Sequence, residues 1–372
     1  MVVFTPRQRM LNAYRGISSD RAPVSPEFWN YYPAKVLGIP MIELEREIPF
    51  WQALKVVFER YQCEGFGIAM PETRNPDLEQ TVTMQGYEET TTYRYRGQSF
   101  TVQKRYDPLE PCWVTKRMAD DPDQLPSILD MLLDPFNIPD FTAAIKGHEA
   151  VDESYLLELW CGVPFFDFIA ELLGFEEAVL YFADEDEAVL QDYRSRYTEY
   201  QKNLVRQAAL STPFESFMIG CSYSCNSLIG KNMWRKWDKP YLKSMADELH
   251  GLGKLLHVHF HGRSIDTVSD FAEIGLDCVC PFERGPGGDI NTPEDLALVR
   301  QLLDDQVTFN GNVHTINTLI RGTPEQVRQE VREIKLAFRG SNRYIIGTGD
   351  QVGGETPEEN ILAMIEEGKK QE

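Results

Sequence analysis

Three histidines alternate with apolar residues in the segment His257-Val258-His259-Phe260-His261-Gly262. Side chains on a β-strand alternate between its two faces, so this spacing places the three imidazoles on one face of a strand. Imidazole titrates near neutral pH and binds divalent metals. The segment therefore predicts a site for metal binding or proton transfer. For any one of these histidines alone, a hydrogen-bonded core position is the alternative.

The elements that position this strand alternate between apolar runs and helical patterns, which is typical of parallel strands joined by crossover helices. In the C-terminal two thirds we expect strands within 155–162, 214–222, 254–261, 277–283, 308–313 and 344–348. Helices are expected near 184–207, 239–252, 267–273, 293–304 and 324–338. A last helix is expected to open with Thr356 as its N-cap.

Two earlier apolar runs, 23–29 and 65–70, bring the expected parallel strands to eight. Eight such units predict an α/β fold, the TIM (β/α)8 barrel, here as a single domain over residues 1–372. The polar stretch at about 88–107, with a turn at Arg96-Gly97-Gln98, predicts an antiparallel hairpin inserted in the N-terminal third. Such an insertion could cover the mouth of the barrel.

In a TIM barrel the chemistry lies where the strands end, so the residues that close each expected strand are site candidates. These candidates are Glu27, Trp29 and Tyr31, then His259 and His261, then Glu283, then Asn312 and His314, and finally Asp350. Histidines and carboxylates that converge from several strands suit a divalent metal or proton transfer. A capping or loop-fixing role is the alternative for each of them taken alone.

Two further motifs favour structural roles. The glycine-rich segment 282–289 opens no helix in the manner of a phosphate-binding loop, so we expect a shaped turn that aims Glu283. The seven cysteines are an odd number and include Cys278-Val-Cys280, which lacks zinc-finger spacing. For these thiols the favoured interpretation is a small buried hydrophobe, with metal ligation as the alternative.

Composition limits the class of function. The formal net charge is -21, which repels nucleic acid and anionic membranes, and no stretch of about 18 uninterrupted apolar residues is present. We therefore expect a cytoplasmic enzyme that acts on a small molecule and binds neither nucleic acid nor membrane. A homodimer is the default expectation for its oligomeric state.

Several of these motifs together resemble one family. They are Arg21-Ala-Pro-Val24, His259-Phe-His261-Gly262, Gly311-Asn312, Arg321-Gly-Thr-Pro-Glu-Gln-Val327, and Gly347-Thr-Gly-Asp350 followed by Glu355-Thr-Pro-Glu-Glu-Asn360. In this order and spacing the chain resembles the uroporphyrinogen decarboxylase superfamily. The resemblance implies a TIM barrel and one of two chemistries: decarboxylation of uroporphyrinogen without a cofactor, or zinc-dependent methyl transfer to or from a corrinoid protein.

The chain departs from both branches of that family. The decarboxylases hold substrate carboxylates with N-terminal arginines, whereas this chain has no arginine between Arg21 and Arg46 and carries Glu27 there. The methyltransferases use His-x-Cys and a later cysteine as zinc ligands, and His259, His261 and Asp350 fall on or near those positions. The resemblance therefore implies a metal held by N and O ligands, which argues against a thiol as methyl acceptor.

The leading hypothesis is a corrinoid-protein-dependent methyltransferase that removes a methyl group from a small methoxylated or methylated substrate. Zn2+ or another divalent metal on His259, His261 and Asp350 would assist, and Glu283 would supply the proton that the leaving heteroatom needs. Trp29, Tyr31 and Tyr32 would wall an aromatic substrate or the corrin ring, with packing at the rim as the alternative. The first alternative function is a metal-free decarboxylase, and the second is a barrel that carries a tetrapyrrole or corrinoid without turnover.

Overall fold

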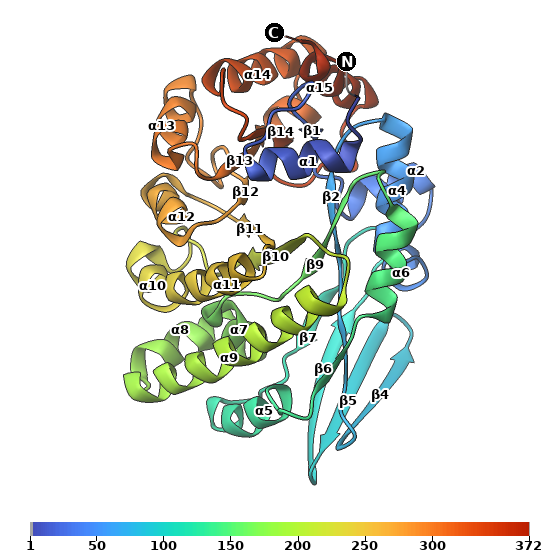
Figure 1. The fold of residues 1–372 in the computed structure, drawn as a ribbon. Coiled ribbons are helices and arrows are strands. Elements are labelled where there is room, and N and C mark those ends of the chain that lie inside the picture. The colour runs from blue at the N-terminus through green and yellow to red at the C-terminus, as the bar shows by residue number, and fades with distance from the viewer. Residues whose placement is uncertain (1–2, 372) are drawn as a thin grey trace.

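A curled sheet of eight parallel strands forms the frame of the molecule, described for residues 3–371 in a computed structural model (Figure 1). All eight strands lie inside the ranges that the sequence predicts. They are β1 (Val24–Ser25), β2 (Phe66–Ala69), β9 (Leu156–Trp160), β10 (Ser216–Cys221), β11 (Leu255–Phe260), β12 (Cys278–Pro281), β13 (Thr308–Val313) and β14 (Tyr344–Thr348).

Helices cover the outer side of this sheet, as the ribbon in Figure 1 shows. The expected helices are confirmed as α9 (Glu187–Ser211), α11 (Lys239–Gly251), α12 (Val268–Ile274), α13 (Pro293–Leu303), α14 (Pro324–Ala337) and α15 (Glu358–Lys369). The sequence patterns missed α1 (Pro6–Arg15), α2 (Tyr31–Leu37), α3 (Met41–Arg46), α4 (Phe50–Tyr61), α5 (Leu125–Leu132), α6 (Thr142–Val151), α7 (Phe165–Leu173), α8 (Phe175–Asp184) and α10 (Gly230–Trp237). Short helical turns lie at Pro122–Gln124, Ile265–Thr267 and Thr315–Ile320.

Threonine side chains cap the starts of two of the expected helices. Thr292 and Thr323 each close a capping box at the start of α13 and α14, and a proline occupies the first turn of both helices. The prediction of Thr356 as the N-cap of α15 is wrong. Pro357 takes the extended N-cap conformation, so the helix begins one residue later than expected, and the buried hydroxyl of Thr356 has no hydrogen-bond partner.

The strands follow one another in chain order from β2 through β9 to β14, and β1 pairs with β14. In the described residues β1 and β2 form no ladder with each other, so the expectation of a closed barrel is wrong and the sheet is an open TIM-like one. The reason is local: β1 has two residues and stands between Pro23 and Pro26, which have no N–H to donate.

Glu64, just before β2, bridges this opening. Its backbone N–H donates to the carbonyl of Val24 at 3.1 Å, and its carboxylate accepts the N–H of Val24 at 2.9 Å. The backbone and side chain of this one buried residue thereby form hydrogen bonds to Val24 that a neighbouring strand would otherwise form.

The insertion between β2 and β9 is larger than the expected hairpin. The hairpin is confirmed as β5 (Glu88–Tyr95) and β6 (Gln98–Arg105), joined by Arg96 and Gly97 at φ 47° and 85°, the positive values that a tight two-residue turn requires. Strands β4 (Leu78–Gln85) and β7 (Trp113–Lys116) extend it to four strands, and β3 (Glu72–Arg74) pairs with β8 (Ile138–Asp140). Figure 1 shows this antiparallel sheet projecting away from the parallel one.

The largest hydrophobic cluster runs from Val24 to Ile365 and therefore joins both ends of the chain. Among the described residues, none of the helices combines the length and the apolar character needed to cross a bilayer.

Candidate active site

A cavity of about 400 Å³ opens at the carboxyl ends of the parallel strands. Five of the residues expected at the site line it: Glu27, Trp29, His259, His261 and Asp350. They come from segments as far apart as β1 and β14, which meet because parallel strands end at one edge of the sheet. The remaining wall consists of Asn30, Ile68, Trp160, Met218, Gly220, Ser222 and Gln351.

The three alternating histidines are linked, directly or through Cys280, in a chain of close contacts that descends from the cavity into the barrel. His261, just beyond the end of β11, has its Nε2 at 2.9 Å from Nε2 of His259. The Nδ1 atom of His259 lies 3.0 Å from Sγ of Cys280, and that sulfur lies 3.1 Å from Nε2 of His257. His257 is fully buried, as expected for the deepest of the three.

Nitrogen, oxygen and sulfur ligand atoms gather in two groups of three at this edge. Glu27, His259 and Cys280 form one group, and His261, Glu283 and Asp350 form the other; within each group the atoms lie within 4.8 Å of one another. The expected ligand set of His259, His261 and Asp350 is thus divided between two groups.

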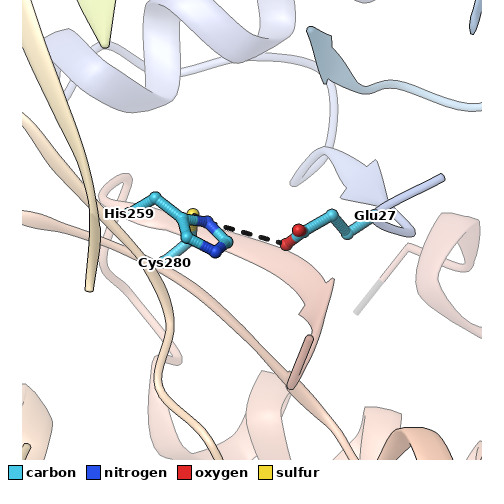
Figure 2. A group of neighbouring side chains, drawn as sticks. All are labelled: Glu27, His259 and Cys280. Carbon is cyan, nitrogen blue, oxygen red and sulfur yellow. Dashed lines mark hydrogen bonds and ion pairs between the residues drawn. The ribbon is translucent and has the colours of Figure 1, made fainter. Parts of the chain in front are cut away.

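Figure 2 shows the first group, with the Glu27 carboxylate facing the imidazole of His259 and the sulfur of Cys280 close to the ring. The Oε2 atom of Glu27 lies 4.0 Å from Nδ1 of His259. Burial raises the pKa of Glu27 to about 8, helped by the charges of Asp350 and Glu283 and opposed by His261. Burial, together with the two neighbouring histidines, holds the pKa of His259 well below its usual range.

The second group is built around His261. Its Nδ1 lies 2.7 Å from Oε1 of Glu283, and that same oxygen accepts the N–H of Gly262 at 3.0 Å. Burial lowers the pKa of His261, but the hydrogen bond to Glu283 and the charges of Asp350, Glu283 and Glu27 outweigh it and raise the pKa to about 9. His261 is therefore an imidazolium at neutral pH, in contrast to the neutral His259.

Burial raises the pKa of Asp350 too, against the attraction of His261. The cavity therefore places a cationic imidazole beside several carboxyl groups.

The first group has the donors that zinc prefers. Zn2+ takes histidine nitrogen, cysteine sulfur and carboxylate oxygen, and catalytic zinc sites use three protein ligands and leave one position open. Glu27, His259 and Cys280 supply one donor of each kind. The residues present therefore fit this metal.

Glu283 does not line the cavity; it lies behind His261. The glycine-rich turn after β12 holds it, because a Cβ on Gly288 would stand 1.9 Å from the backbone oxygen of Glu283. Only glycine allows this close approach. The expected shaped turn is present, and Glu283 acts on His261 rather than on the contents of the cavity.

Two of the expected substrate-binding residues, both at the end of β13, lie outside the cavity. The amide of Asn312 is fully buried and donates to the carbonyls of Phe282 and Ile290 at 3.1 and 3.0 Å. Nδ1 of His314 accepts the N–H of Ile316 at 3.2 Å, at the start of a helical turn. The sequence predicts both residues at the end of β13. It does not reveal that backbone groups of the nearby loops form hydrogen bonds with both side chains.

The three aromatic residues that were expected to form one wall of the site lie in different places. The hydroxyl of Tyr31 donates to Glu110 at 2.6 Å, and Tyr32 is buried against Tyr61. Of the three expected aromatics only Trp29 lines the cavity, because α2 begins at Tyr31 and turns the chain away.

Cys280 belongs to a candidate donor group, whereas the sequence favoured a buried structural thiol there and kept metal ligation as the alternative. The sequence contains part of this information, since a cysteine on the strand after the histidine strand can lie beside a histidine. In the structure Cys280 is the direct neighbour of His259 in the ladder. What the pattern lacks is the strand register. Cys278 is paired with His257, two residues deeper, and is buried, as expected for both thiols.

A second, larger cavity of about 640 Å³ adjoins the first and shares Trp29, Asn30 and Ile68 with it. Its other wall includes Lys104 and Tyr106 at the end of the inserted sheet. The insertion thus borders the approach to the donor groups.

Comparisons with known proteins agree with this architecture. The family model described as Uroporphyrinogen decarboxylase (URO-D) matches residues 188–371, the part of the chain that contains β10 to β14. The solved structure of a methyltransferase from Methanosarcina mazei superposes with a TM-score of 0.65 at 16% identity and covers 98% of this chain and 98% of that chain. At this identity the likeness shows the fold.

Two further solved structures match in part. An uncharacterized protein has a TM-score of 0.29 at 13% identity and covers 46% of this chain and 44% of its own; an amidohydrolase has a TM-score of 0.28 at 15% identity and covers 45% and 41%. These scores are too low to support an argument. No curated protein sequence matches the chain. Residues 188–371 therefore form a domain that matches the uroporphyrinogen decarboxylase family, and the order of the strands and the position of the cavity at their carboxyl ends agree with that match.

Proposed function

We propose that the protein is a metal-assisted methyltransferase that takes a methyl group from a small methoxylated or methylated substrate and passes it to a corrinoid-binding partner protein. The observation that carries the proposal is the Glu27, His259 and Cys280 donor group, which opens into a cavity walled by Trp29 and Trp160. The likeness of the whole fold to the Methanosarcina methyltransferase supports it.

Glu27, His259 and Cys280 would hold the metal. We prefer this set to His259, His261 and Asp350 because its three donors match zinc and because Nδ1 of His261 is engaged by Glu283. Zinc bound there would supply a Lewis acid that polarises the heteroatom of the substrate.

The leaving heteroatom needs a proton, because the methyl–heteroatom bond breaks with both electrons left on oxygen or nitrogen. His261 is the proton donor in this proposal, since it lines the cavity and Glu283 fixes its ring. Glu283 is a positioning residue, which replaces its expected role as the donor itself. The methyl group leaves toward the corrinoid of the partner, and the larger adjoining cavity provides the space for that approach.

Electrostatics disfavour decarboxylation of a polycarboxylate. Among the residues that line the smaller cavity the basic groups are His259 and His261, whereas Glu27 and Asp350 face the same space. A substrate with several carboxylates needs a matching cation for each of them, and the cation that this lining supplies is the imidazolium of His261.

Metal analysis and a methyl-transfer assay test the proposal. We expect about one zinc per chain in the purified protein and its loss in Cys280→Ser, while Cys278→Ala, a buried thiol on the same strand, retains it. With free cob(I)alamin as acceptor and a panel of methoxylated aromatics and methylated amines, methylcobalamin should form and be detected by absorbance. A metal-free protein that releases CO2 from an acid would contradict the proposal, and so would one that binds cobalamin without any turnover.

The proton-donor role has its own test. His261→Gln should slow methyl transfer about 10²- to 10⁴-fold, the range of a general acid, and leave the zinc content unchanged. Loss of zinc in this variant would return His261 to the ligand set and contradict its role as the donor.

A further inference from the structure

A buried polar chain lies beneath the donor groups, in the interior of the barrel. Glu158 on β9, Ser216 on β10 and His257 on β11 are each 0% exposed, and so is Tyr14 on α1. Nothing in the proposed transfer of a methyl group uses these side chains. Their number is unusual for a barrel interior, which branched apolar residues normally fill.

The chain has a continuous order of contacts. The hydroxyl of Ser216 donates to Oε1 of Glu158 at 2.5 Å, and Oε2 of Glu158 lies 2.8 Å from Nδ1 of His257. The hydroxyl of Tyr14 lies 3.1 Å from the same Nδ1. On the other side of the ring, Nε2 of His257 lies 3.1 Å from Sγ of Cys280.

Burying a carboxyl group is costly unless it is paired and hydrogen-bonded. Within residues 3–371, Glu158 forms no ion pair with a lysine or arginine; the titratable side chain that it contacts is His257. Packing alone does not explain such a pair, because an apolar residue of similar volume would fill the space at no desolvation cost. The histidine of this pair contacts the sulfur of Cys280. This contact suggests that the pair acts on that sulfur.

Cys280 stands between two imidazoles. Its sulfur contacts Nε2 of His257 below and Nδ1 of His259 above, at 3.1 and 3.0 Å. A cysteine side chain can take three staggered positions about its first torsion. In the position that it takes, Sγ contacts the ring of His257 and also lies in the group with Glu27.

We propose that Glu158 and His257 are positioning residues that hold Sγ of Cys280 in place as a metal ligand. The inference rests on the proposed zinc site. Metal sites commonly use a carboxylate to orient a histidine ligand from behind, and loss of such a partner weakens metal affinity about 10- to 100-fold. Here the carboxylate and the histidine together orient a sulfur ligand.

The test measures zinc affinity by competition with a chelator. The key variants are Glu158→Gln and two replacements of His257 that divide its ring contacts. Asparagine places its amide near Nδ1 and so keeps the contact to Glu158, whereas glutamine reaches the position of Nε2 and keeps the contact to Cys280. We expect Glu158→Gln and His257→Asn to bind zinc about 10- to 100-fold more weakly and His257→Gln to recover most of the loss.

Cobalt substitution gives a readout that a general loss of stability would not move. Co2+ bound to a thiolate has a sulfur-to-metal charge-transfer band in the near ultraviolet. We expect that band to weaken in His257→Asn and to return in His257→Gln. Cys278→Ala is the control on the same strand. Its buried side chain contacts Tyr14 and is not part of the donor group, so this variant should keep both the affinity and the band.

The possible outcomes separate the two proposals. If the parent protein binds no zinc, the proposed metal site and this inference are both overturned. If the parent binds zinc and the folded Glu158→Gln and His257→Asn variants bind it equally well with an unchanged cobalt band, only the positioning role is overturned. If Glu158→Gln does not fold, the comparison of His257→Asn with His257→Gln decides.

Discussion

Two buried glutamates at the first strand have opposite surroundings. Glu64, 1% exposed, accepts hydrogen bonds from Arg9 at 3.1 Å, from Arg21 at 2.9 and 2.6 Å and from the backbone N–H of Val24 at 2.9 Å. Glu27, 7% exposed, has Nδ1 of the neutral His259 at 4.0 Å and lies within the influence of the acids Asp350 and Glu283.

This difference in charge pairing distinguishes a carboxylate that stabilises the fold from a carboxyl group that suits a functional site. Glu64 has its charge matched by arginines and fastens the opening between β1 and β2, so its position stabilises the fold. Glu27 holds a proton that it would lose in water, so its position destabilises the charged form. A buried carboxyl group without a matching cation, at the mouth of a cavity, is typical of a functional residue.

Glu64→Gln should cause the largest loss of stability. It leaves the guanidinium of Arg21 without its carboxylate, and breaking a buried ion pair from one side costs about 3 kcal/mol or more. Urea denaturation would measure the free energy of unfolding. Glu79→Gln is the control, because Glu79 and its partner Arg94 are exposed and such pairs contribute about 0–1 kcal/mol. Equal effects of the two variants would remove the distinction between Glu64 and a surface acid.

Glu27→Gln should act in the opposite direction in metal-free protein. Glu27 ionises near pH 4.5 in the unfolded chain and near pH 8 in the folded protein, so between these values the folded state binds one more proton. Stability therefore falls as the pH rises from 4.5 to 8 and stays reduced above pH 8. Glutamine cannot ionise and escapes this loss. We expect the variant to be more stable than the parent by up to a few kcal/mol at pH 8.5 and equally stable near pH 4.

Unfolding in urea with EDTA at both pH values would measure this difference. With zinc present we expect the parent to be more stable than the variant, because the variant has lost a carboxylate ligand and the metal stabilises the parent more. A metal-free variant that is less stable than the parent at pH 8.5 would show that Glu27 carries a structural charge as Glu64 does.

Thr348→Val should have the smallest effect. Its hydroxyl accepts the backbone N–H of Glu27 at 3.0 Å, and a buried N–H without an acceptor costs about 1 kcal/mol or somewhat more. Thr356→Val is the matched control, since that hydroxyl is buried without a partner and its removal should be neutral or stabilising. Thermal unfolding of both variants would test the pair, and equal losses would refute the anchoring of Glu27 through Thr348.

Much of the fold is predictable from local patterns. The apolar runs of the parallel strands are short and bounded, and each of them forms a strand where expected. The polar hairpin is predictable because Arg96-Gly97 favours one tight turn. Strand β4 was missed because it is exposed along most of its length and its apolar residues, Leu78, Val82 and Met84, are few and interrupted by Gln80. Closure was wrongly expected because the length of β1 depends on prolines and on the distant Glu64.

The candidate site was predictable in its location but not in its groups. Strand alternation and the rule that barrel chemistry lies at the carboxyl ends brought His259, His261 and Asp350 to one cavity. The role of Cys280 was not predictable, because its buried apolar pattern is the same as that of Cys278. Only the register between β11 and β12 distinguishes the two thiols.

By itself the sequence determined the parallel strands, the face of the histidine strand and the edge at which polar side chains meet, because these follow from periodicity along the chain. The tertiary structure alone decided which carboxyl group is paired and which is not, and which thiol stands beside His259. Those properties depend on distances between residues far apart in the chain and on the exclusion of water from the groups they surround, and neither is encoded in local spacing.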